Sequence, residues 1–108
     1  MANIYRVLGQ INPTANTATT LYTVPSATST VASTLTVCNL GATTTFRIAI
    51  RPGGASLANT QYISYDTIVN TSDTVFLTVG LSLATTDVVT CSANTGNVTF
   101  SLFGTEIS

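Results

Sequence analysis

Apolar and polar residues alternate in short segments along most of the chain. The clearest segment is residues 44–51 (TTFRIAIR), in which one phenylalanine and two isoleucines share one face. Arg47 and Arg51 fall on the opposite face, because successive side chains of a strand point to opposite sides. The same kind of pattern predicts eight strands, over residues 4–8, 20–24, 34–40, 44–51, 61–69, 74–81, 87–92 and 98–103.

No segment has the spacing of apolar residues that is typical of an amphipathic helix, and one helical turn near Ala58 is the most we expect. Eight short strands separated by turn residues, such as Pro52-Gly53-Gly54, are typical of an all-β sandwich. The specific prediction is one domain over residues 1–108 with a jelly-roll topology, and a Greek-key sandwich of another order is the alternative. A weak strand pattern leaves open an extended N-terminal arm over residues 1–19.

The composition is unusual for its lack of charge. Only 6% of the residues are charged, against about 25% in an average soluble domain. The chain contains 23 Thr and 10 Ser but no Lys, His or Trp, and its formal net charge is −1. Three arginines cannot form the basic patch that nucleic-acid binding needs, and no apolar run is long enough to span a membrane. We therefore expect neither nucleic acid nor a membrane as a partner.

A surface with so few charges favours association. Low net charge promotes contact between copies, and the buried centres of interfaces are depleted in charged residues. The composition therefore predicts a homo-oligomer, with closed symmetry burying the apolar surface.

The titratable residues give little support to catalysis. Without histidine, a Ser-His-Asp or Cys-His arrangement cannot form within this chain. The four acids, Asp66, Asp73, Asp87 and Glu106, are scattered, and we expect structural roles for them. Asp73 and Asp87 precede apolar strands, where a short acid accepts hydrogen bonds from turn amides. We expect no enzyme activity, no metal site and no cofactor.

The two cysteines, Cys38 and Cys91, fall in the third and seventh predicted strands. Two alternatives are open: a cross-strand disulfide, or two small side chains buried separately in the sheets.

Five residues are candidates for an interface. Arg47 and Arg51 share a strand face and could clamp a partner carboxylate, and the alternative is a solvated or intrachain pairing, with Asp66 as one acceptor. Tyr62 and Tyr65 fall on opposite faces of their predicted strand, so at most one belongs to the core. The other, for which we take Tyr62, is a candidate interface anchor. The other aromatic candidate is Phe103, which points away from the core positions of its strand.

Several segments resemble small virion structural proteins of tailed bacteriophages, of the kind that cyanophages carry. The likeness covers most of the chain after Val37 and is weaker before it. The residues that carry it are 38–41 (CNLG), 44–52 (TTFRIAIRP), 57–59 (LAN), 62–66 (YISYD), 77–81 (LTVGL), 86–89 (TDVV) and 103–107 (FGTEI).

The resemblance implies a virion location after assembly in the host cytoplasm, with the major capsid protein or other virion proteins as partners. Some small β-sandwich proteins of phages are capsid decoration, or cement, proteins, which sit as trimers on the shell and bridge neighbouring capsomers. The expected function is therefore capsid decoration. A tail or tail-fibre component is one alternative, and a carbohydrate-binding module for host recognition is another, which would need Tyr22, Tyr62 and Phe103 to converge.

Overall fold

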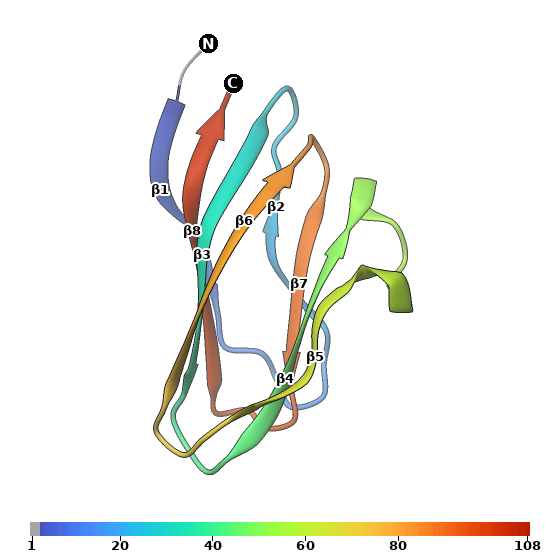
Figure 1. The fold of residues 1–108 in the computed structure, drawn as a ribbon. Helices are drawn as coiled ribbons and strands as arrows, with labels where there is room; N and C mark the ends of the chain where they lie inside the picture. Colours follow the sequence, from blue (N-terminus) through green and yellow to red (C-terminus); the bar gives the residue numbers. More distant parts are fainter. Residues whose placement is uncertain (1–2) are drawn as a thin grey trace.

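The protein is a β-sandwich of two four-stranded antiparallel sheets, here described from a computed structural model (Figure 1). The structure describes residues 3–108, apart from the side chain of Val79. The strands are β1 (Asn3–Ile11), β2 (Thr19–Thr23), β3 (Ser29–Asn39), β4 (Thr44–Arg51), β5 (Tyr62–Val69), β6 (Thr74–Leu83), β7 (Val88–Ala93) and β8 (Val98–Ile107). All eight strands predicted from the alternation of apolar residues are present, and two 3-10 turns, Pro52–Gly54 and Asn59–Gln61, lie between β4 and β5.

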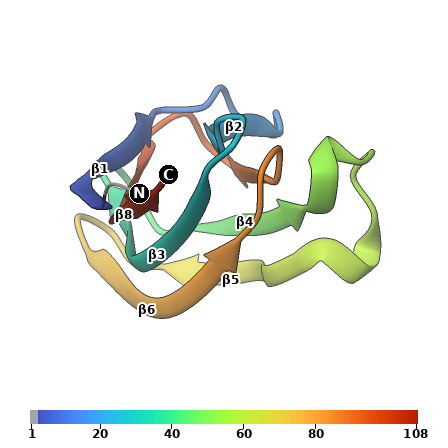
Figure 2. The ribbon, with the colours of Figure 1, turned by 90° about the horizontal axis from the view of Figure 1, so that it is seen from above.

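The strand order is that of a jelly roll. Sheet A has the order β1-β8-β3-β6 and sheet B the order β2-β7-β4-β5. Strands 1 and 8, 2 and 7, 3 and 6, and 4 and 5 pair as in one long hairpin. The hairpin then rolls up, so that β8 also pairs with β3 and β7 with β4. Figure 2 shows the two layers from above. The predicted jelly roll is confirmed.

The core lies between the two sheets. Phe46 of sheet B and Phe100 of sheet A meet edge to face, with their ring centroids 6.1 Å apart. Both rings are almost completely buried, as the alternation in their strands predicts. Around them pack mainly valine and leucine side chains from both sheets, including Val24, Leu35, Val37, Ile48, Val69, Val89, Val98 and Leu102.

The N-terminal segment belongs to the sandwich. Residues 3–11 form the edge strand β1, which pairs along β8, and Leu8 is buried in the core. This part of the expected arm is therefore a strand of sheet A in the structure. Gly9 of the same strand approaches sheet B so closely that a Cβ at this position would lie 2.2 Å from the carbonyl oxygen of Leu21.

The two cysteines do not form a disulfide. Cys38 lies on β3 of sheet A and Cys91 on β7 of sheet B. Cys91 is buried in the core, whereas Cys38 alternates with the buried Val37 and Asn39 and so points to the outside of its sheet. The structure therefore has the alternative arrangement of two separate thiols, although only Cys91 belongs to the core.

Candidate functional site

The outer face of sheet A is apolar and hydroxylated. Opposite residues on neighbouring strands form rows across this face: Tyr5 and Val31 flank Thr105, while Val7 and Thr34 flank Phe103. A further row joins Gln10, Ser101, Thr36 and Phe76. Its large exposed side chains are Tyr5 (80% exposed), Phe76 (70%), Val7 (46%) and Val31 (42%). Phe103 points outward as predicted, although its neighbours leave it only partly exposed.

None of the seven charged residues lies on this outer face, within the part of the chain that the structure describes. Arg6 and Glu106 form an ion pair on the inner side of the same sheet. Asp87 accepts hydrogen bonds from the turn amides of Gly53 and Ala84, as predicted, whereas Asp73 accepts one from Thr74, the first residue of β6. The remaining three charges belong to sheet B.

The outer face of sheet B carries the other ion pair. Arg47 donates hydrogen bonds to both carboxylate oxygens of Asp66, 2.7 Å from Nε and 3.2 Å from Nη2. The hydrogen bond between the two side chains raises the pKa of Arg47 and lowers the pKa of Asp66. The guanidinium also lies 4.1 Å from the ring centroid of Tyr65, a cation–π contact. The structure thus has the intrachain pairing that was the alternative to a clamp on a partner.

Tyr62 and Tyr65 lie together, so the prediction that they occupy opposite faces of β5 is wrong. Their ring centroids are 4.9 Å apart at an interplanar angle of 79°. The reason is irregular pairing: Tyr62 lies opposite Ala49 and Ser64 opposite Ile48, so β5 has one extra residue between Tyr62 and Ser64. A second register shift follows near Asp66, which has a φ of 52°. Each extra residue of a bulge reverses the alternation of faces. The same shifts leave Ile63 exposed while Val69 is buried.

Arg51 holds the connection between β4 and β5. Its Nε donates to the carbonyl oxygen of Ala55 (2.7 Å) and its Nη2 to that of Gly54 (3.1 Å). At the other end of the connection, Gln61 bonds to the backbone of Ser56 and Ala58. These contacts fix the turn that carries Asn59 beside Tyr62, and they leave Arg51 engaged within its own chain.

Two hollows lie near the Arg47–Asp66 pair on sheet B. One, of about 450 Å³, is lined by Asn59, Tyr62 and Tyr65. The other, of about 120 Å³, lies between the ion pair and a group of short polar side chains. Its lining residues are Asn16, Thr45, Phe46, Arg47, Asp66, Ser92, Ala93 and Asn94.

No protein-family model matches this chain, and no curated protein matches it. The family resemblance therefore remains a prediction from the sequence. Within residues 3–108, no helix has the length and apolar character needed to cross a membrane. No three Cys, Asp or Glu side chains of the described residues lie together in a possible metal site.

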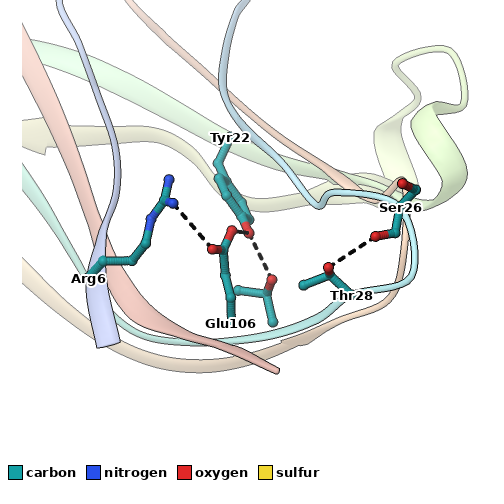
Figure 3. A network of polar contacts seen from close by, with 6 residues as sticks. Arg6, Tyr22, Ser26, Thr28 and Glu106 are labelled. Carbon is teal, nitrogen blue, oxygen red and sulfur yellow. Dashed lines mark hydrogen bonds and ion pairs between the residues drawn. The ribbon is translucent and has the colours of Figure 1, made fainter. Parts of the chain in front are cut away.

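A buried polar network joins the two sheets at one end of the sandwich (Figure 3). Tyr22 of β2 donates a hydrogen bond of 2.5 Å to Glu106 of β8, and Glu106 pairs with Arg6 of β1 at 3.3 Å. Thr30 of β3 lies 2.8 Å from the Tyr22 hydroxyl. Tyr22 is thus an interior residue, so Tyr22, Tyr62 and Phe103 do not converge into one aromatic platform.

Sequence reasoning missed this network and the Tyr62–Tyr65 pair. Only Glu106 could have indicated the network. It lies on the same face of its strand as the buried Val98, Phe100 and Leu102, because their positions differ by even numbers. A carboxylate at a core-facing position needs charged or hydroxyl partners. The identity of those partners depends on the strand order.

Proposed function

We propose that this protein is a structural, non-enzymatic subunit of a tailed-phage virion, acting as a capsid decoration protein that associates with its own copies. The observation that carries the proposal is the outer face of sheet A. This face carries large exposed apolar side chains and no charge, while the charged residues are engaged elsewhere within the chain.

The size of the face suits an interface. Four strands of about ten residues, spaced about 4.8 Å apart, cover on the order of 600 Å². A stable protein interface buries about 800 Å² on each partner, and its centre is poor in charged residues. Phe76 and Tyr5 lie on the two edge strands of this sheet, so apolar anchors are present at both of its sides.

The fold is compatible with this role. Eight-stranded jelly rolls are common in viral capsid proteins and also in lectins. Since one fold supports many functions, this likeness alone does not select one. The phage resemblance of the sequence favours the virion, and a three-fold arrangement is the oligomer that decoration implies.

The test is self-association measured by sedimentation velocity over a hundredfold range of protein concentration. We expect the wild type to form a defined oligomer, a trimer, and the Phe76→Arg variant to remain monomeric. Ile68→Arg is the matched control, because Ile68 is 63% exposed on β5 of sheet B, against 70% for Phe76. A wild type that stays monomeric throughout, or a Phe76→Arg variant that associates normally, would contradict the proposal.

A further inference from the structure

The outer face of sheet B differs from that of sheet A in chemistry. It combines an exposed aromatic pair, a bidentate ion pair and two hollows within one region. We propose that this region binds a neutral pyranose saccharide, which would stack on Tyr65 and bond to the Arg47–Asp66 pair and Asn59.

Tyr65 supplies an apolar ring surface, one face of which lies against the Arg47 guanidinium. It remains 56% exposed although it contacts both Tyr62 and Arg47. Those two contacts limit its freedom, so little conformational entropy is lost when a ligand packs on it. The C–H face of a pyranose ring is the surface that packs against such an aromatic side chain.

The ion pair supplies matched hydrogen-bonding groups. The two side chains are 38% and 49% exposed, so Arg47 and Asp66 can reach a ligand without leaving each other. A guanidinium only donates, and a carboxylate only accepts. Two neighbouring hydroxyl groups can satisfy both at once, since each hydroxyl can donate and accept.

Asparagine side chains also line the two hollows. No hydrogen bond engages the side chains of Asn16, Asn59 or Asn94 within the described residues, although all three line the hollows. Asn59 belongs to the larger hollow, whose volume of about 450 Å³ lies within the range of small-molecule sites, roughly 300–1,000 Å³. The smaller hollow is lined by Arg47 and Asp66 themselves, and Arg47 contacts Tyr65 of the larger one, so an oligosaccharide could reach both.

The charges of the region favour a neutral ligand. Asp66 neutralises the charge of Arg47, and Arg51 donates hydrogen bonds to two backbone carbonyls of its own loop. An anionic polymer would meet the Asp66 carboxylate, and an apolar ligand would leave the ion pair and the amides without hydrogen bonds. This inference does not depend on self-association, which uses the opposite face of the molecule.

The experiment is binding of the purified full chain to an array of neutral cello-, malto-, galacto- and chito-oligosaccharides, with polysialic acid as an anionic probe. For each saccharide bound, amide shifts in ¹H–¹⁵N spectra locate the site. We expect saturable binding to at least one neutral saccharide, with shifts on β4, β5 and the 52–61 connection. Binding to polysialic acid alone, no binding at all, or shifts confined to sheet A would overturn the proposal.

Variants then test the residues. Tyr65→Ala should weaken binding by about tenfold or more, which corresponds to about 1.4 kcal/mol. The matched control is Tyr5→Ala, an equally simple loss of an exposed tyrosine on sheet A, which should leave affinity within about twofold, a change of roughly 0.4 kcal/mol. Asn59→Ala, in an exposed turn, gives a second test should Tyr65→Ala fail to fold. The proposal would be overturned if Asn59→Ala, or a folded Tyr65→Ala, bound the saccharide as tightly as the wild type does.

Discussion

The hydroxyl of Tyr22 donates a hydrogen bond of 2.5 Å to Glu106, a residue 84 positions away in the other sheet. Because that hydroxyl has a single proton, the contact with Thr30 at 2.8 Å must use the Thr30 hydroxyl as donor. The carboxylate is 7% exposed and has Arg6 as its cation. Tyr22 therefore satisfies a buried charge and also joins the two sheets.

The first prediction is that Tyr22→Phe destabilises the fold. The change removes a hydrogen bond to a buried charged acceptor, which typically costs about 1.5–3 kcal/mol. Urea denaturation at neutral pH measures the loss. Tyr5→Phe is the control, because Tyr5 is 80% exposed on the outer face of sheet A and takes no part in the network. Equal stability of wild type and Tyr22→Phe would show that the contact is not formed in solution.

The same network predicts a loss of stability at alkaline pH. Burial, followed by the hydrogen bond to Glu106, raises the pKa of Tyr22 from 10.0 to about 12. The folded state thus holds this proton more tightly than the unfolded state does. The resulting stabilisation is complete below pH 10 and is lost as the pH rises towards 12. Unfolding free energies measured across this interval should fall less steeply in Tyr22→Phe than in the wild type, and parallel curves would contradict the assignment.

A second prediction concerns hydroxyl groups buried without a partner. The Oγ1 atoms of Thr44 and Thr90 are buried and make no hydrogen bond to any of the described residues. Thr90→Val removes that hydroxyl at nearly constant shape and should raise the unfolding free energy by about 1 kcal/mol. Thr30→Val is the matched opposite case, because Thr30 donates to Tyr22, and it should be destabilising. Destabilisation by Thr90→Val would indicate a partner for its hydroxyl.

A third prediction follows from the close approach of two strands at Gly104. A Cβ there would lie 2.3 Å from the carbonyl oxygen of Val31 and 2.8 Å from Cα of Ala32. Both are backbone atoms, so Gly104→Ala must shift β3 or β8 and should cost about 1–3 kcal/mol. Gly96→Ala is the control, since no atom in the described part of the chain lies within 4 Å of a Cβ at that position. Thermal unfolding of the two variants compares them directly.

A fourth prediction concerns the thiols. Burial raises the pKa of the Cys91 thiol, and its side chain is 1% exposed. A Cys38→Ser variant should therefore be unreactive towards Ellman's reagent until urea unfolds it. A reducing agent should leave the melting temperature of the wild type unchanged. A lower melting temperature in reductant would instead indicate the disulfide that the structure lacks.

The alternation of apolar residues was enough to predict the eight strands, because burial of one sheet face imposes a period of two. It also placed Phe46 and Phe100 in the core and turned Phe103 outward. The alternation failed at β5, where Asp66 adopts a left-handed conformation and the pairing slips. Aspartate tolerates this conformation better than most residues, but the sequence does not mark where a bulge will form.

The pattern of apolar residues does not predict contacts between strands that are distant in the sequence. The pairing of Tyr22 with Glu106 requires β2 and β8 to lie against each other, which follows from the rolled hairpin and not from any local motif. The pairing of Arg47 with Asp66 was among the alternatives, because Asp66 falls within a predicted strand and could accept from Arg47 or Arg51. The partners of Arg51, two loop carbonyls, left no signal in the sequence.

The proposed role in a virion is tested most directly by the copy number of this protein in purified particles, measured by quantitative mass spectrometry. A decoration protein should be present at a copy number comparable to that of the major shell protein. A number smaller by an order of magnitude or more would contradict decoration and point to a tail or fibre position. Complete absence from the particles would contradict a virion role altogether.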